Sequence, residues 1–136
     1  MPVVPVPVTC HSEKMEVQHV ARNTDLHLRN QMIYSVFVRN YSSEGTFEKV
    51  REDLPRIRSL GADIIWLMPI HPIGKSNRKG SMGSPYAIRD YRAINPEYGT
   101  LEDFQALVDS IHALGMKVII DVVYNHTSPD SWLREN

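Results

Sequence analysis

The sequence predicts an α/β fold in which three parallel strands alternate with two helices. Apolar and β-branched residues dominate 32–38, 64–68 and 117–123, which is typical of strands in a buried sheet. Between them, two segments carry apolar residues at helical spacing and end at Gly61 and Gly115, a residue type that favours helix C-termini. Because strand–helix–strand connections are crossovers, we expect the strands to be parallel and the crossovers right-handed.

The first helix is expected between Phe47 and Leu60, where apolar residues recur every three or four positions. Pro55 lies inside this segment and has no N–H to donate to the preceding turn. Two interpretations are open: a single helix with a kink, or a second helix that restarts with Asp53 as its N-cap.

The second helix is expected to begin after Thr100. A threonine followed three residues later by a carboxylate, here Asp103, is a short variant of the capping box. The segment before this helix, 70–98, carries several glycines and is long for a connection within a compact domain. Loops of this length are more often functional than idle, so we expect this one to contribute to a site.

Composition limits what the protein binds and where it acts. The 136 residues suffice for one modest core, and 15 Lys and Arg against 16 Asp and Glu leave a net charge of -1, which favours neither nucleic acid nor anionic membranes as partners. The single cysteine, Cys10, excludes an internal disulfide. No apolar run approaches the roughly 20 residues that span a bilayer, and prolines interrupt any signal-peptide core. We therefore expect a cytoplasmic protein, with 1–30 as an N-terminal extension or tail.

The third predicted strand ends in three side chains able to do chemistry. Residues 121–126 read Asp-Val-Val-Tyr-Asn-His, so a carboxylate, an amide and an imidazole come directly after an apolar run. An α/β barrel builds its site at the carboxyl ends of its strands, which makes this segment a candidate functional site. The sequence contains no Ser-His-Asp elbow, no phosphate-cradling glycine loop and no Cys/His spacing typical of a metal site.

Three segments together resemble the α-amylase family of glycoside hydrolases, family 13. They are the signature at 121–126, the stretch 61–70, and the loop segment Tyr-Ala-Ile-Arg-Asp-Tyr at 86–91 with 95–100 after it. The three segments follow one another in the order and at the spacing found in the family, and the resemblance extends from about residue 32 to residue 136. The resemblance implies a (β/α)8 TIM barrel, which needs about 250 residues. Residues 31–136 would then be the N-terminal portion of the catalytic barrel, with its first three strands and two helices.

The resemblance implies site roles for four residues. His126 would hydrogen-bond the sugar at the point of cleavage, and Tyr86 would form an aromatic platform beneath it. Asp121 would support the substrate site as a hydrogen-bonded carboxylate and not as the nucleophile. Asn125 would be a calcium ligand only in a complete enzyme, because calcium takes six to eight oxygens. Ala87 departs from the aspartate of many members, and each of these residues alone would be read as an ordinary structural side chain.

Other polar residues of the long loop are assigned structural roles. Arg89 and Asp90 are expected to fix the loop, and His71 is interpreted as part of the loop structure and not as a ligand. The segment 74–83 shows no regular carboxylate spacing, so we assign it no metal.

The resemblance implies a retaining glycosidase that acts on α-1,4-glucans such as starch, or on maltooligosaccharides and maltodextrin. Retaining enzymes use two carboxyl groups about 5–5.5 Å apart, which the family places after strands four and five. We therefore assign no catalytic residue and expect the isolated chain to be inactive. A non-catalytic sugar-binding fragment or barrel relative is the alternative. Amylase, glucosidase, cyclodextrin hydrolase and glucanotransferase stay open, as does whether the chain is a natural fragment, and unpaired strand edges make self-association possible.

Overall fold

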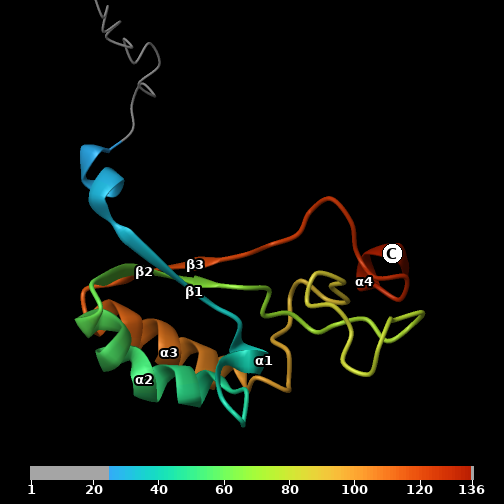
Figure 1. The fold of residues 1–136 in the computed structure, drawn as a ribbon. Helices are drawn as coiled ribbons and strands as arrows, with labels where there is room; N and C mark the ends of the chain where they lie inside the picture. Colours follow the sequence, from blue (N-terminus) through green and yellow to red (C-terminus); the bar gives the residue numbers. More distant parts are fainter. Residues whose placement is uncertain (1–24, 136) are drawn as a thin grey trace, which may run out of the picture.

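The computed structural model describes residues 25–135, so most of the expected N-terminal extension, including Cys10, lies outside the described residues. A short 3-10 helix, η1, opens this part of the chain and leads into a three-stranded sheet with its helices (Figure 1). The elements are η1 (Leu26–Asn30), β1 (Met32–Val36), α1 (Val38–Tyr41), α2 (Phe47–Ser59), β2 (Ala62–Leu67), α3 (Leu101–Ala113), β3 (Lys117–Ile120) and α4 (Trp132–Glu135).

The three strands form one parallel sheet in the order β1-β2-β3, which confirms the predicted fold class. Each of the first and third strands is shorter than the sequence suggested. Chain direction changes after Val36, because α1 begins at Val38. Pro69, which has no backbone N–H to donate to a neighbouring strand, follows two residues after β2 ends at Leu67. Because Leu67 is the partner of Ile120, β3 has no partner strand beyond Ile120.

The helix α2 is continuous through Pro55, so a restart with Asp53 as an N-cap is wrong. The Asp53 carboxylate instead accepts hydrogen bonds from the Arg56 guanidinium and, at short range, from the Tyr41 hydroxyl. The bonds from Arg56 and then Tyr41 hold the pKa of Asp53 below its usual value. Burial, followed by the Asp53 contact, raises the pKa of Tyr41 to about 12.

The start of α3 confirms the predicted capping box. Thr100 Oγ1 accepts the backbone N–H of Asp103 at 3.2 Å, and Asp103 Oδ2 accepts the backbone N–H of Thr100 at 2.8 Å. The two helices end as expected before glycines with positive φ, 93° at Gly61 and 72° at Gly115.

The core lies between the sheet and the two long helices, which cover the same face (Figure 1). The apolar stripe of α2 is fully buried, as are Leu107 and Ile111 of α3. Phe47 lies at the centre of an aromatic group, with ring centroids 5.8 Å from Tyr98 and 5.5 Å from Phe104. This packing fixes α2 and α3 against the sheet.

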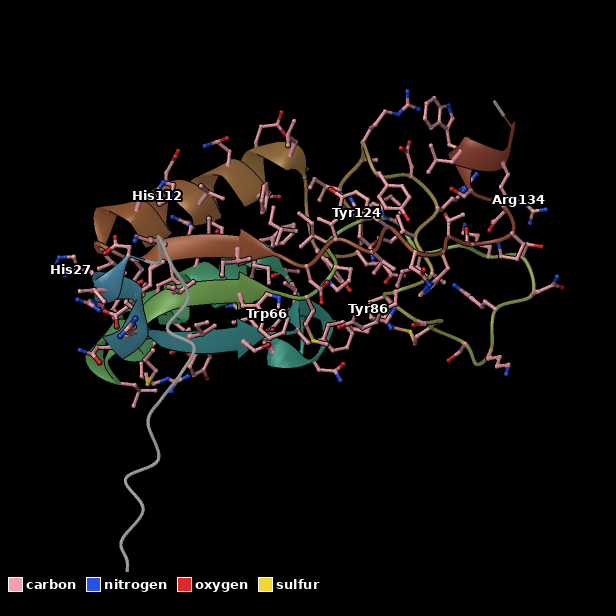
Figure 2. The ribbon with its side chains drawn as sticks, turned by 90° about the horizontal axis from the view of Figure 1, so that it is seen from above. His27, Trp66, Tyr86, His112, Tyr124 and Arg134 are labelled. Atoms are coloured by element: carbon pink, nitrogen blue, oxygen red, sulfur yellow. The ribbon has the colours of Figure 1, made fainter. Side chains whose placement is uncertain are left out.

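The opposite face of the sheet is open, so β2, whose apolar run is typical of a strand in a buried sheet, is covered by helices on one face only within the described residues. Ile33, Trp66 and Ile119 point away from the helices and are 52%, 40% and 44% exposed. Trp66 pairs with Ile119 on one side and with Ser35 on the other. Figure 2 looks onto this face and shows Trp66 with no element above it. The described chain supplies no layer that would cover it.

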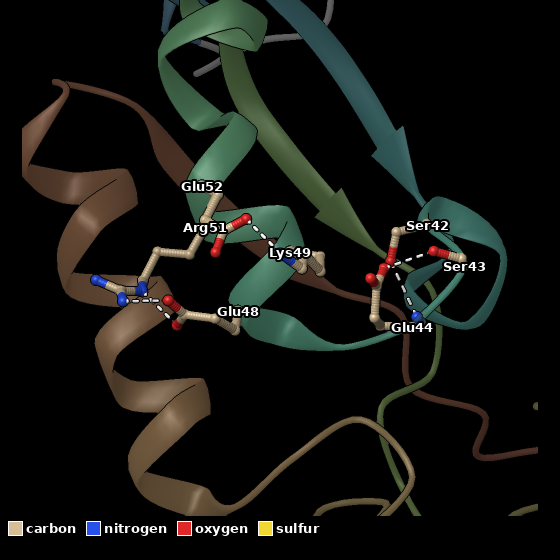
Figure 3. A network of polar contacts seen from close by, with 8 residues as sticks. Ser42, Ser43, Glu44, Glu48, Lys49, Arg51 and Glu52 are labelled. Atoms are coloured by element: carbon tan, nitrogen blue, oxygen red, sulfur yellow. Dashed lines mark hydrogen bonds and ion pairs between the residues drawn. The ribbon is translucent and has the colours of Figure 1, made fainter.

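The outer surface of α2 carries ion pairs at i,i+3 spacing, Arg51 with Glu48 and Lys49 with Glu52 (Figure 3). Solvent screens exposed pairs of this kind, so the buried stripe stabilises the helix more. Within 25–135, no helix has the length and apolar character that crossing a membrane requires.

The core analysis predicts the effect of Phe47→Ala. Removing this fully buried ring leaves a cavity between α2, Tyr98 and Phe104, and we expect a loss of about 3–5 kcal/mol in the free energy of unfolding, measured by urea denaturation. Leu101→Ala is the control, because Leu101 is 63% exposed and its loss should change stability by less than about 0.5 kcal/mol. Equal effects of the two variants would contradict the proposed core.

Candidate functional site

The carboxyl ends of the strands lie at one edge of the sheet, where a single backbone hydrogen bond follows the end of β2 and another follows the end of β3. The backbone N–H of Met68 donates to Val36 O at 3.0 Å, and that of Asp121 donates to Leu67 O at 2.8 Å. These bonds place Asp121 beside the end of β2. The first side chain of the signature therefore lies where α/β barrels place their functional groups.

Two of the predicted site residues meet at this edge. The Tyr86 hydroxyl donates to Asp121 Oδ2 at 3.1 Å, across 35 positions of sequence. Both side chains are half-buried. Burial, and then the hydrogen bond to the carboxylate, raise the pKa of Tyr86 above its usual value, so the phenol stays protonated at neutral pH.

The loop that carries Tyr86 folds back on itself in two short arms. The first arm contains Ile73 and Gly74, and the second contains Ala87 and Ile88. Gly74 N donates to Ala87 O at 2.9 Å, and residues Ile73 and Ile88 form an antiparallel bridge. Ile88 is fully buried, so the second arm is anchored in the interior. This pairing fixes the backbone next to Tyr86.

The segment after the signature clamps the second arm. Thr127 Oγ1 and the backbone N–H of Ser128 both donate to Ile88 O, at 2.6 and 3.0 Å. The backbone N–H of Trp132 and the Ser131 hydroxyl both donate to Arg89 O, each at 3.0 Å. The segment 127–132 is therefore held to the loop at two backbone carbonyls that follow Tyr86 closely in sequence, those of Ile88 and Arg89.

Asp130 clamps the first arm in the same way. Its Oδ2 accepts the backbone N–H groups of Lys75 at 2.9 Å and Ser76 at 3.3 Å, and these bonds, the first above all, lower the pKa of the carboxyl. A Cβ at Gly74 would lie 2.2 Å from Ser128 Cβ and 2.6 Å from Asp130 Oδ1, so only glycine permits this approach.

Tyr91 holds the rest of the signature through its backbone. Its hydroxyl lies 2.6 Å from Val123 O, to which it donates, and 3.1 Å from His126 O. The His126 side chain is exposed and makes no hydrogen bond to another residue of the described part. The structure thus orients His126 by its main chain and leaves its imidazole accessible to a ligand, while no hydrogen bond joins it to Tyr86 or Asp121.

The residues present do not fit a calcium site on their own. Asn125 is exposed, and no group of three His, Cys, Asp or Glu side chains in 25–135 is arranged to hold a metal ion. One amide oxygen is far short of the six to eight oxygens that calcium takes. The calcium role of Asn125 stays a prediction for a complete enzyme.

A cavity of about 460 Å³ lies beside the signature, against the open edge of β3. Its lining includes Tyr91 and Tyr124, whose rings stack with centroids 6.5 Å apart and planes 5° apart. Tyr124 is labelled in Figure 2. Tyr124 is 88% exposed. Neither tyrosine was assigned a role from sequence, although both lie inside the two motifs that pointed to the site.

His71 also lines this cavity, but its ring is engaged in the loop. Its Nδ1 lies 3.0 Å from Ala93 O, and because a carbonyl only accepts, this nitrogen carries the proton. Asp90 similarly accepts the backbone N–H of Arg92 at 2.9 Å. Both contacts agree with the structural roles expected for His71 and Asp90.

Comparison with known proteins assigns the family. The model of the alpha amylase catalytic domain matches residues 18–136. The chain belongs to the alpha-amylase family. Solved structures with the same arrangement include an alpha-amylase from Lactobacillus plantarum, 69% identical, with a TM-score of 0.78 over 79% of this chain and 26% of that one.

Other relatives of this alpha-amylase family chain differ in activity. An alpha-1,4-glucan:maltose-1-phosphate maltosyltransferase from Cereibacter sphaeroides is 38% identical over 76% of this chain and 20% of its own length. A probable oligo-1,6-glucosidase 3 from Bacillus subtilis is 35% identical over 79% of this chain and 20% of its own. The chain thus spans about a fifth of the curated relatives that it matches, and the family contains both hydrolases and transferases.

The Tyr86–Asp121 contact predicts a measurable change in titration. In Asp121→Asn the negative charge is lost, so we expect the pKa of Tyr86 to fall towards its ordinary value, while burial keeps it somewhat raised. Nuclear magnetic resonance of ring-labelled tyrosine, titrated between neutral and alkaline pH, measures this shift. The control is Asp130→Asn, which removes a loop carboxylate that does not contact Tyr86. An unchanged pKa in Asp121→Asn would contradict the contact.

Proposed function

We propose that this chain contributes the first substrate-binding segments of a retaining α-amylase-type enzyme. Its substrates would be α-1,4-glucans such as starch, or maltooligosaccharides. The observation that carries the proposal is the Tyr86–Asp121 pair at the carboxyl edge of a parallel sheet. It occurs in a chain that is 69% identical to the matched part of an alpha-amylase.

The proposed roles of the side chains follow from their settings. The half-buried ring of Tyr86 would bury the apolar face of a pyranose, and Asp121 would hold that ring by accepting its hydroxyl. The exposed imidazole of His126 offers one donor and one acceptor to sugar hydroxyls. The three residues would bind and orient a sugar, and none of them would form the glycosyl bond.

A retaining mechanism needs a nucleophile and an acid/base, two carboxyl groups about 5–5.5 Å apart. The Asp121 carboxylate accepts a hydrogen bond from the Tyr86 hydroxyl, and we propose that it holds this ring in place, so we do not assign it as the nucleophile. We propose that both catalytic carboxylates belong to parts of the enzyme outside these 136 residues. The isolated chain would then bind sugar at most and catalyse nothing.

Two further readings stay open. The likeness to a maltosyltransferase favours a transferase as the second candidate, in which a sugar hydroxyl and not water would capture the glycosyl intermediate. A non-catalytic sugar-binding role is the other alternative. The cytoplasmic location inferred from the sequence stays a prediction.

The function is tested with the chain and its genomic continuation expressed as one protein. We expect turnover of maltooligosaccharides with retention of the anomeric configuration, followed by nuclear magnetic resonance. His126→Ala should lower kcat/KM by about tenfold to a hundredfold, because sugar hydroxyls lose a hydrogen-bond partner. His112→Ala on the exposed side of α3 is the matched control and should change nothing. Inversion, or equal effects of the two variants, would refute the assignment.

The 136-residue chain alone gives a separate prediction. We expect no turnover from it, and we expect it to self-associate through the open sheet face and the unpaired strand edges. Sedimentation velocity should show concentration-dependent oligomers. Ile119→Glu on that face should shift them towards monomer, whereas Leu101→Glu, at a more exposed position at the start of α3, should not. A monomer at all concentrations would contradict this proposal.

A further inference from the structure

A second cavity, of about 190 Å³, lies on the loop away from the Tyr86–Asp121 contact. It opens between the first arm of the loop and the segment 95–97, and its lining includes neither Tyr86 nor Asp121. Its lining residues include three that carry a cation, Lys75, Arg78 and Arg89, and one that carries a carboxylate, Glu97. The net charge of this lining is therefore positive.

The three cationic residues of the cavity have no ion-pair partner among residues 25–135. Within the described part of the chain, the side chains of Lys75, Arg78 and Arg89 form no ion pair, whereas Arg51, Arg56 and several others do. Glu97 faces a fourth cation, with Arg39 Nη2 3.8 Å from its Oε2. The cavity thus gathers positive charge and shares its only carboxylate with an arginine outside the lining.

The backbone that carries these cations is held in place. Arg39 donates to Gly83 O at 3.1 Å and to Met82 O at 3.2 Å, which closes the turn of the loop. The stem of Arg78 packs over Gly83, since a Cβ there would lie 3.0 Å from Arg78 Cδ. A closed turn and a packed stem lower the entropy that Arg78 would lose on binding a ligand.

The other two cations are anchored through their main chains. Lys75 N is bound by Asp130, and Arg89 N donates to Pro72 O at 2.8 Å. All three cationic residues are exposed, so an anion reaches them without unfolding the loop. Hydrogen bonds therefore hold the backbone of the cavity in place, while its cationic residues stay accessible to a ligand.

We propose that this cavity binds a phosphate dianion, either inorganic phosphate or the phosphate group of a sugar phosphate. Guanidinium groups match phosphate oxygens with paired, charge-assisted hydrogen bonds, and Arg78 and Arg89 supply two such groups while Lys75 adds a point charge. Three cations opposed by one carboxylate suit a doubly negative ligand better than a neutral sugar. This site goes beyond the proposed glycosidase function and does not depend on it.

Isothermal titration calorimetry of the chain with inorganic phosphate and, separately, with glucose 6-phosphate tests the site. We expect saturable one-to-one binding that weakens with added sodium chloride, because the attraction is between exposed charges. Tighter binding of glucose 6-phosphate would identify a sugar phosphate as the ligand, and equal binding would identify the free anion. Absence of saturable binding to both would overturn the proposal.

Charge variants locate the binding. Arg78→Gln and Arg89→Gln should each weaken it about tenfold, the usual loss for one charge-assisted hydrogen bond, and Glu97→Gln should strengthen it. Lys117→Gln is the matched control, because Lys117 is exposed at the opposite end of the sheet. Circular dichroism confirms that each variant is folded. Equal affinities in Arg78→Gln, Arg89→Gln and Lys117→Gln would place the anion elsewhere and overturn the assignment.

Discussion

The register of the parallel sheet is the constraint on which the rest of the structure depends. Leu67 of β2 pairs with Val36 and Ile120, and all three side chains face the helices, while Trp66 pairs with Ser35 and Ile119 on the open face. A slip of one residue would exchange the two faces, so burial of one face against α2 and α3 determines the register. The same register sets the bond from Asp121 N to Leu67 O and so places the signature at the edge of the sheet.

The site is then built by hydrogen bonds to backbone carbonyls more than by contacts between side chains. Ile88 O and the carbonyl of Arg89 accept from the segment 127–132, and the carbonyls of Val123 and His126 lie at the Tyr91 hydroxyl. Each such bond contributes roughly 0.5–1.5 kcal/mol net, comparable to or greater than an exposed ion pair on α2. The result is a braced loop that leaves His126 and Tyr124 free to meet a ligand.

The open face of the sheet links the structure to the family. Ile33, Trp66 and Ile119 are apolar side chains that a barrel would enclose, and the chain covers only 26% of the solved alpha-amylase that it matches. The proposed division of labour follows from this: binding groups at the edge of this sheet, and catalytic carboxylates supplied by further strands. The basic cavity lies on the same loop but uses other side chains, so the two proposals stand or fall separately.

Local patterns in the sequence determined the alternation of three parallel strands with two helices, the Thr100–Asp103 cap and the motifs that contain Tyr86, Asp121 and His126. Such features depend on residues a few positions apart, and their physical signals are periodicity, capping and glycine at positive φ. Only the tertiary structure decided that Asp53 pairs with Tyr41 and Arg56 instead of capping a helix, that Asp130 clamps a loop 55 positions away, and that Lys75, Arg78 and Arg89 share one cavity. These contacts depend on which segments, distant in sequence, lie close together in the fold, and the spacing of residues along the chain does not indicate that.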